Sequence, residues 1–306
     1  MHSIYTDLAC EARELHPEID GVREETEEGD GILITRTVLE TDEAAKKLGK
    51  AKGNYVTLDA PALSERPLDL FSRVSAALSK ELHSLFPELK NDASVLIVGL
   101  GNRNVTPDSL GPRIIDQIYV TRHVSAYLPD AFSKPVFGVC AVAPGVLGVT
   151  GIETIEIVRG VVEHVKPSLI IVLDSLASRR SSRIGCTVQI TDTGISPGSG
   201  VGNTQEGING QSFSIPVIAV GIPLVVYAST ITGDAISLMA EEHGLKEDEE
   251  TLKKLADKLL EEHLGPMIVT PKDIDAIVND MSRVLADGIN MALFGASYEE
   301  VRMLIA

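Results

Sequence analysis

Two short apolar runs decide the fold: SVLIVGLGN at residues 94–102 and SLIIVLDSL at residues 168–176. Each consists mainly of aliphatic residues and ends in glycine or in a polar side chain, and the amphipathic stretch TGIETIEIVRGVVEHV at residues 150–165 lies between them. Continuous apolar strands that are joined through a helix are typical of a parallel sheet covered by helices on both faces. The sequence therefore predicts an α/β fold with a mostly parallel sheet.

Patterns elsewhere in the chain extend this fold. Further strands are expected at ILITRTVL (32–39), YVTLDA (55–60), CTVQIT (186–191) and IPVIAVGIPLVV (215–226), and a helix at residues 67–86. Residues 240–306 are predicted to be mainly helical, with the charges of residues 241–263 on a solvated face. The first 30 residues are acidic and predict an irregular segment that closes with a solvated connector, REETEEGDG (23–31).

Composition limits the classes of function. A chain of 306 residues with 44% hydrophobic residues is large enough to bury one sizeable core. Its net charge of −17 argues against a nucleic-acid or anionic-membrane surface, because phosphate binding requires a basic face. The two longest uncharged stretches, residues 135–152 and the run between Glu206 and Asp234, are interrupted by glycine and proline, so neither predicts a membrane span.

Cysteine and histidine spacing excludes the common metal and redox motifs. The three cysteines, Cys10, Cys140 and Cys186, are far apart, so the sequence predicts neither a disulfide framework nor a Cys-x-x-Cys site, and a reducing cytoplasm is expected. The seven histidines include no His-x-x-x-His or His-Glu-x-x-His pattern. No metal site is predicted.

Two aspartates follow the two central strands. Asp108 lies in the loop after the first strand, and Asp174 stands at the end of the apolar run of the second. The carboxyl ends of parallel strands meet at one edge of a sheet, so the fold brings these carboxylates together. Two close carboxylates do not ionise together easily, and such a pair supplies an acid and a base for amide hydrolysis. A structural alternative stays open, in which Asp108 caps the following helix and Asp174 caps a loop with Ser175.

Two other motifs are typical of different classes of protein. The glycines of GLGN (99–102) suggest a phosphate loop, but the third glycine of the dinucleotide fingerprint is missing, so a nucleotide-binding α/β protein is kept only as an alternative. The tripeptide Asp192-Thr193-Gly194 is that of pepsin-like proteases, whose folds are all-β. In this α/β context it predicts a turn or a substrate-lining loop.

Three motifs taken together carry a resemblance to a known family. GLGN…TPDSLGP (99–112), LDSLASR (173–179) and DTGISPGSGVGN (192–203) resemble the motifs of the germination proteases of spore-forming bacteria, and the likeness runs across most of the chain. The resemblance implies an atypical aspartic endopeptidase without a metal or other cofactor, with an α/β fold similar to that of hydrogenase maturation proteases. It also implies that Asp108 and Asp174 are the two essential aspartates.

The resemblance further implies a biological setting. Members are zymogens that remove their own propeptide, and they form homotetramers in the cytoplasm of the forespore and in the spore core. Their substrates are the small acid-soluble proteins that coat spore DNA, so neither nucleic acid nor membrane is an expected direct partner. A hydrogenase-maturation-type protease, which would bind nickel through carboxylates and histidine, is the alternative of the same fold; the 90-residue N-terminal region argues against it.

The sequence TDLACEA at residues 6–12 looks like a cleavage site of this family, which cleaves after Glu or Asp and before a hydrophobic residue that alanine follows. The resemblance implies self-cleavage between Asp7 and Leu8, with residues 1–7 as propeptide and residues 8–306 as a single peptidase domain. Ile4 stands where substrates of the family prefer an acidic residue, so this site is expected to be a poorer substrate. Without the family, the same stretch predicts a loosely held tail with an incipient helix at residues 8–16.

Substrate-binding residues are predicted around the two strand ends. Residues 99–183 contain nine Lys or Arg against seven Asp or Glu, although the whole chain is acidic. A guanidinium group binds a carboxylate in bidentate fashion, so an arginine is expected to bind the acidic residue before the scissile bond. The candidates are Arg103, Arg179 and Arg180, with Gly99, Gly101 and Asn102 as oxyanion donors. Leu224 and Tyr227 replace a threonine and an aspartate of the family pattern, which puts a helper carboxylate there in doubt.

Overall fold

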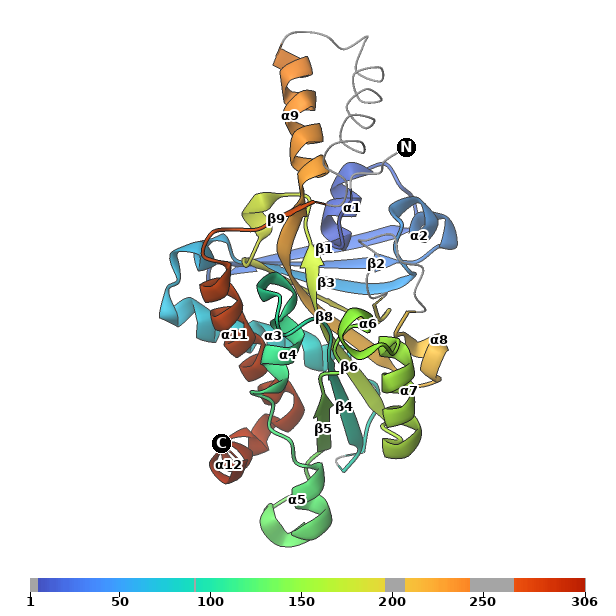
Figure 1. The fold of residues 1–306 in the computed structure, drawn as a ribbon, viewed down its shortest axis with the longest axis vertical. Coiled ribbons are helices and arrows are strands. Elements are labelled where there is room, and N and C mark those ends of the chain that lie inside the picture. The colour runs from blue at the N-terminus through green and yellow to red at the C-terminus, as the bar shows by residue number, and fades with distance from the viewer. Residues whose placement is uncertain (1–4, 91, 196–206, 243–266, 306) are drawn as a thin grey trace.

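The computed structural model describes residues 5–90, 92–195, 207–242 and 267–305, which form an α/β fold around one sheet (Figure 1). In these residues the strands lie in the order β1-β2-β3-β7-β8-β6-β4-β5, and β9 pairs with β8. Their bounds are β1 Val22–Gly29, β2 Ile32–Leu39, β3 Gly53–Asp59, β4 Ser94–Gly99, β5 Gly138–Val142, β6 Leu169–Ala177, β7 Thr187–Thr191, β8 Val217–Tyr227 and β9 Ile268–Val269.

The parallel half of the sheet is the part that the sequence predicted best. Strands β5, β4, β6 and β8 run parallel, and β4 and β6 lie in the two apolar runs at residues 94–102 and 168–176. The core residues of β4 and β6 are almost fully buried on both faces, which explains why their sequences do not alternate between polar and apolar residues. The α/β class is confirmed.

The other half of the sheet is antiparallel, so the sheet is mixed rather than mostly parallel. Strands β1, β2, β3 and β7 pair antiparallel with one another, and β7 pairs antiparallel with β8. The turn between β1 and β2 consists of Asp30 and Gly31, with φ angles of 55° and 77°. A two-residue Asp-Gly turn of this kind forms a tight hairpin, whereas a parallel crossover requires a dozen residues or more. The predicted connector at residues 23–31 is therefore wrong: most of it is an edge strand whose charges face solvent.

Helices cover both faces of the sheet. The helices are α1 Ala9–Leu15, α2 Asp42–Leu48, α3 Leu68–Ser84, α4 Leu110–Ile115, α5 Arg122–Tyr127, α6 Leu147–Thr150, α7 Thr154–Val165, α8 Gly210–Phe213, α9 Ala228–Glu242, α11 Ile274–Phe294 and α12 Tyr298–Ile305. On one face, α3, α4 and α11 bury the largest core cluster. On the other, α7 covers the parallel half and α1 and α2 cover the antiparallel half. Figure 1 shows α4 and α11 on one side of β4 and β6 and α7 on the other.

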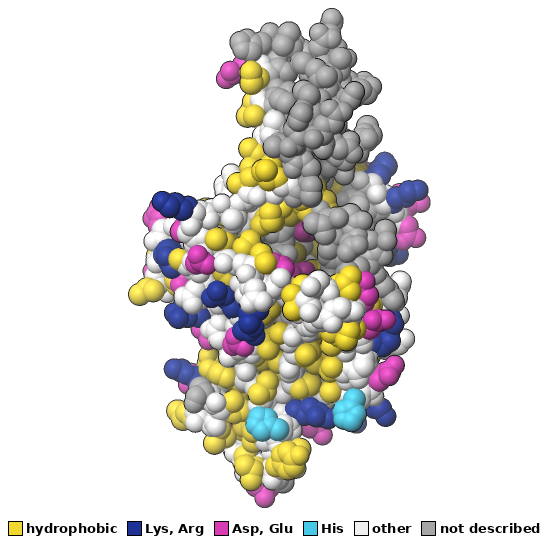
Figure 2. All heavy atoms as spheres, in the orientation of Figure 1, with side chains coloured by type: hydrophobic (Ala, Val, Ile, Leu, Met, Phe, Trp, Pro, Cys, Tyr) yellow, Lys and Arg dark blue, Asp and Glu magenta, His cyan; other side chains and the backbone are white. Residues whose placement is uncertain are grey.

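The C-terminal part is helical where the structure describes it, as predicted, although it also contains the short strand β9. The charged stretch at residues 241–263 lies almost entirely outside the described residues. Figure 2 shows hydrophobic side chains along α9, where Leu238 and Met239 are more than half exposed. Among the described helices, none combines the length and the apolar character needed to span a bilayer.

Candidate active site

Asp174 lies on β6, on the face of the sheet between α7 and α1. Its neighbours on that face of the strand are Val172, which packs against α7, and Leu176, which packs against Leu8. The Asp174 carboxylate accepts a hydrogen bond from the backbone N–H of Ser175 at 2.8 Å, which is the local cap of the structural alternative. Burial raises the pKa of Asp174 well above its ordinary value, and the nearby charge of Asp108 raises it further.

Asp108 reaches the same edge of the sheet from the loop after β4. It ends the 3₁₀ turn η2 Thr106–Asp108, which packs against β6 and β8. The backbone N–H of Asn102 donates to its carboxylate at 2.8 Å. Gly101 has a φ of 110°, and a Cβ there would lie 2.0 Å from the Asp108 carbonyl oxygen, so only glycine fits beneath this loop. Burial raises the pKa of Asp108, while the Asn102 hydrogen bond opposes that shift.

The Asp108 charge raises the pKa of Asp174, so the two aspartates lie near each other, although β6 continues for three residues beyond Asp174 instead of ending there as the sequence predicted. Helix α4 begins after Ser109 without a side-chain cap, so the N-cap alternative for Asp108 is wrong. A pair of buried acids in which one proton is held firmly supplies both an acid and a base. Asp174 is the better candidate for the protonated partner, because the charge of Asp108 adds to the effect of its burial.

The N-terminal segment is firmly held at this same site, contrary to the expectation of a loose tail. Leu8 is fully buried and Ala9 is 1% exposed, and the incipient helix at residues 8–16 is the helix α1. Leu8 and Cys10 pack against Leu176 of β6. The apolar contacts with the sheet thus hold a stretch whose composition alone looks too polar to anchor.

The residues before the Asp7–Leu8 bond are held by β6 and by Lys50. The Asp7 backbone N–H donates to the Ala177 carbonyl at 2.9 Å, and the Ala177 N–H donates to the Asp7 carboxylate at 2.7 Å. The Tyr5 hydroxyl donates to the other carboxylate oxygen of Asp7 at 2.6 Å. Lys50 Nζ donates to the Thr6 carbonyl at 2.8 Å; burial lowers the pKa of Lys50, and the Asp7 charge partly offsets that shift.

Glu11 fixes the segment beyond the bond. Its carboxylate is 1% exposed and accepts hydrogen bonds from the backbone N–H groups of Arg179, at 2.6 Å, and Arg180, at 3.0 Å. The Arg183 guanidinium lies 3.5 Å away. A buried carboxylate needs such partners to offset its desolvation, so Glu11 and the loop after β6 specify each other's position.

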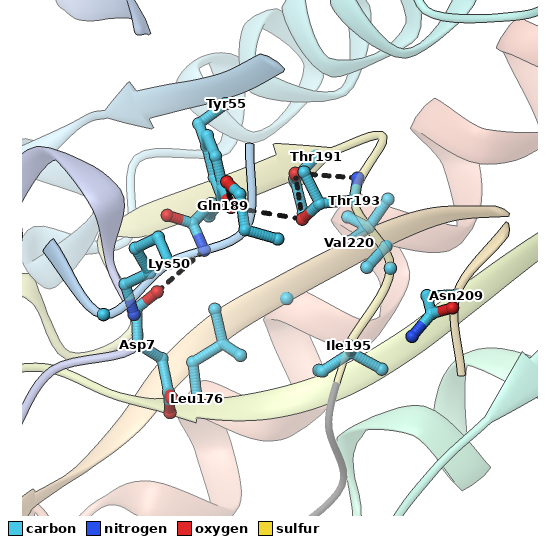
Figure 3. A pocket seen from close by; sticks show the side chains of 15 residues that line it. Asp7, Lys50, Tyr55, Leu176, Gln189, Thr191, Thr193, Ile195, Asn209 and Val220 are labelled. Atoms are coloured by element: carbon cyan, nitrogen blue, oxygen red, sulfur yellow. Dashed lines mark hydrogen bonds between the residues drawn. The ribbon is translucent and has the colours of Figure 1, made fainter. Parts of the chain in front are cut away.

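A cavity of 230 Å³ opens beside Asp7 (Figure 3). Its walls come from β6, β7, β8 and the residues before β3, and its lining includes Lys50, Leu176, Gln189 and Gly221. Figure 3 shows the Gln189 side chain directed at Asp7, with a hydrogen bond between them. The space is several times what one water molecule needs.

The other predicted substrate-binding residues make contacts within the chain. The Asn102 N–H is bound to Asp108, and Gly99 is packed so closely on α4 that a Cβ would lie 2.4 Å from the Gly111 carbonyl oxygen. The guanidinium groups of Arg103, Arg179 and Arg180 pair with Asp116, Asp234 and Glu14, respectively. Their role toward a substrate stays a prediction; Arg179 and Arg180 reach the segment through their backbone N–H groups.

The Asp192 carboxylate holds two strands of the sheet together. Its carboxylate accepts hydrogen bonds from the backbone and the side-chain nitrogen of Asn54, which tie the end of β7 to β3. The predicted turn after β7 fits this arrangement, since Gly194 has a φ of 77°. Residues 196–206 of the DTGISPGSGVGN motif lie outside the described residues.

The two departures from the family pattern lie on β8. Leu224 is fully buried in the core under α11, and Tyr227 packs edge-on against Tyr5 with ring centroids 5.2 Å apart. The Tyr227 ring thus contacts the segment before the Asp7–Leu8 bond. Within the described part of the chain, no group of three or more His, Cys, Asp or Glu side chains is placed to hold a metal ion.

Sequence reasoning missed Gln189, Lys50 and Glu11. Gln189 could have been found from the sequence, because it is a long polar side chain among the threonine and aliphatic residues of TVQIT. No sequence pattern distinguishes Glu11 and Lys50, because charged residues near a terminus or after a helix usually lie on the surface.

Comparisons with known proteins identify the family. The family model described as germination protease matches residues 1–261. The germination protease of Caldanaerobacter subterraneus subsp. tengcongensis is 47% identical to this chain, in an alignment that covers 99% of this chain and 98% of the relative. The germination protease of Clostridium acetobutylicum is 42% identical, and the alignment covers 96% of each chain. The chain belongs to the germination protease family and is therefore a protease.

Two further matches are more distant. The germination protease of Bacillus thuringiensis subsp. konkukian is 36% identical over 95% of this chain and 94% of its own length. Among solved structures, the crystal structure of a [NiFe] hydrogenase maturation protease HycI from Thermococcus kodakarensis KOD1 matches with a TM-score of 0.36 and 13% identity, covering 68% of this chain and 98% of that chain. A likeness at that level bears on neither the mechanism nor the ligands of this chain.

Proposed function

We propose that this chain is an aspartic-type endopeptidase that first removes its own residues 1–7 and then cleaves small acid-soluble spore proteins after Glu or Asp. The observation that carries the proposal is the docked N-terminal segment. An intact Thr-Asp-Leu-Ala sequence lies over the end of β6, and the Asp7 charge contributes to the raised pKa of Asp174. The segment supports the proposal because it holds a substrate-like bond in a fixed position near Asp174.

The residues supply each step of a hydrolysis. Asp174 is the acid, because its pKa is raised more strongly than that of Asp108, and Asp108 is then the base. As a water oxygen bonds to the Asp7 carbonyl carbon, Asp108 takes a proton from the water and Asp174 gives its proton to the carbonyl oxygen. When the C–N bond breaks, the Leu8 nitrogen takes the proton from Asp108, and the diol returns a proton to Asp174. The products are an Asp7 carboxyl group and a new amino terminus.

The docked segment also accounts for the proposed specificity. The Ala177 N–H binds the Asp7 carboxylate, and the Lys50 charge lies close to it. Leu8 enters an apolar site against Leu176, and the fully buried Ala9 leaves little room for a larger side chain. These contacts favour an acidic residue, then an apolar one, then alanine, although the whole chain has a net charge of −17.

Mass spectrometry of the purified chain tests the proposal. We expect a mature N-terminus at Leu8, and processed protein should cleave a peptide that contains Thr-Glu-Ile-Ala-Ser-Glu after its first Glu. Asp7→Ala and Leu8→Lys should block removal of residues 1–7, because each removes a group that the site binds. Asp20→Ala, at an exposed acidic residue nearby, is the matched control and should process normally. A mature N-terminus elsewhere, or processed protein that cleaves no such peptide at any pH, would refute the proposal.

A further inference from the structure

Gln189 lies in the same cross-strand row as Asp174. In the sheet register, Gln189 of β7 is opposite Gly221 of β8, and Gly221 is opposite Asp174 of β6. Register partners point their side chains to the same face, so Gln189 and Asp174 project from either side of Gly221. The neighbouring strands are about 4.8 Å apart, so two side chains separated by a glycine leave room for a peptide between them.

The Gln189 amide binds the backbone on both sides of Leu8. Its Nε2 donates to the Asp7 carbonyl at 3.0 Å, and its Oε1 accepts from the Ala9 N–H at 2.7 Å. Leu8 has φ and ψ angles of −81° and 126°, and in such an extended residue the preceding carbonyl and the following N–H point the same way. Because the Ala9 N–H is a donor, the atom facing it must be the amide oxygen, and the NH₂ group therefore faces the carbonyl of Asp7.

We propose that Gln189 is a third catalytic residue, whose amide NH₂ binds the oxygen of the scissile carbonyl and stabilises the negative charge that develops on it. This inference rests on the function proposed above. The contact is made in the intact chain to the carbonyl of the bond that would be cleaved. Gln189 is only 6% exposed, so its hydrogen bonds compete little with water, and donors preorganised in this way contribute strongly to catalysis.

A glutamine fits this position for a chemical reason. The site already contains two acids and the Asp7 carboxylate, and a neutral amide donates to the developing oxyanion without pairing with those carboxylates beforehand. Both contacts are made to backbone atoms, so Gln189 would hold any substrate in the same register whatever its side chains. Gln189, Gly221 and Asp7 all line the same cavity, which leaves space for water beside the segment.

The test compares Gln189→Met with the wild-type chain. Methionine preserves the length of the side chain but neither donates to the carbonyl nor accepts from the N–H as the amide does. We expect self-processing, and kcat on the Thr-Glu-Ile-Ala-Ser-Glu peptide, to fall by about 100-fold or more. Gln189→Glu keeps the acceptor for the Ala9 N–H and loses the donor, so it should be equally impaired. Gln211→Met, the same change at an exposed residue of α8, is the control and should behave as wild type.

A substrate change separates the catalytic role from a packing role. In a peptide that carries lactate in place of alanine, an ester oxygen replaces the N–H that Gln189 Oε1 accepts. The kcat/KM of the wild-type protein should be lower on this ester than on the amide peptide. Gln189→Met should cleave the ester and the amide peptide equally, because it has no Gln189 Oε1 to accept from that N–H. Equal losses in both proteins would show that Gln189 does not bind this group.

The outcomes distinguish the two proposals. If wild-type protein cleaves the peptide and Gln189→Met remains within threefold of it, the inference about Gln189 is overturned and the proposed function stands. If wild-type protein cleaves neither itself nor the peptide, the proposed function fails and the inference fails with it. Circular dichroism and urea unfolding of each variant exclude loss of the fold as the cause.

Discussion

The parallel and antiparallel halves of the sheet supply different residues to the candidate site. The parallel half supplies the two acids, with Asp108 in the loop after β4 and Asp174 inside β6, one residue beyond the last pair of β6 with β4. The antiparallel half supplies contacts to the backbone of the docked segment, from Gln189 on β7 and from Lys50 between α2 and β3. The candidate acids thus come from the parallel strands, whereas the position of the docked segment depends in part on the antiparallel strands beside them.

The largest effect is expected at the acids of the parallel half. Asp108→Asn and Asp174→Asn should each slow removal of residues 1–7 by about 100- to 10,000-fold, because proton transfer is lost while shape is kept. The N-terminus is followed by mass spectrometry over time. Chelators should have no effect on the wild-type chain.

Asp192→Asn provides the comparison for these variants. Its carboxylate ties β7 to β3, so the change should lower the free energy of unfolding by about 1 kcal/mol and leave most of the activity. Loss of turnover in Asp192→Asn comparable to that in Asp174→Asn would place the acid pair elsewhere.

The pH dependence separates the roles of the two acids. In the proposed mechanism Asp174 must be protonated, so the rate of self-processing should fall as the pH rises through the raised pKa of this group. The native state also holds this proton more firmly than the unfolded chain. The stability that it contributes is complete below the ordinary aspartate pKa of about 4 and is lost as the pH rises through the folded value.

Urea unfolding at a series of pH values measures this linkage. The advantage of Asp174→Asn over wild type in unfolding free energy should grow as the pH rises, because asparagine never ionises. A difference that stays constant across pH would show that Asp174 titrates normally in the folded protein.

A smaller effect is expected where the segment meets the loop after β6. In an Asp174→Asn background that prevents processing, Glu11→Ala leaves the N–H groups of Arg179 and Arg180 without their carboxylate. Unfolding free energy should fall by about 1–3 kcal/mol for each buried group left unpaired. The exposed Glu18→Ala is the control, with a change within about 0.5 kcal/mol. Equal stability of Glu11→Ala and the control would mean that this segment is not docked in solution.

The smallest effect is expected at the Tyr5–Tyr227 contact. An edge-to-face aromatic pair contributes about 0.5–1.5 kcal/mol, so Tyr227→Ala should slow self-processing by about two- to tenfold. Tyr227→Phe keeps the ring and should lie close to wild type. If Phe and Ala are equally slow, the hydroxyl rather than the ring is responsible.

The sequence by itself determined the parallel half and named Asp108 and Asp174 as candidate acids. The runs at residues 94–102 and 168–176 are apolar on both faces, which requires buried parallel strands, and strand ends at one edge then bring Asp108 and Asp174 together. The Asp-Gly pair at residues 30–31 is also a recognisable turn signal in the sequence. The acidic residues before it do not predict a strand, because the stability of this edge strand comes from its pairing with β2.

Only the tertiary structure decided how the N-terminal segment is held. Residues 5–11 carry no local pattern that predicts burial, because Leu8, Glu11 and the Asp7–Leu8 bond contact residues about 170 to 180 positions away in the sequence. The same holds for Gln189, whose two hydrogen bonds exist only because β7 lies antiparallel between β3 and β8. Hydrogen bonds and apolar contacts between distant segments depend on the assembled sheet, and local propensity contains no information about them.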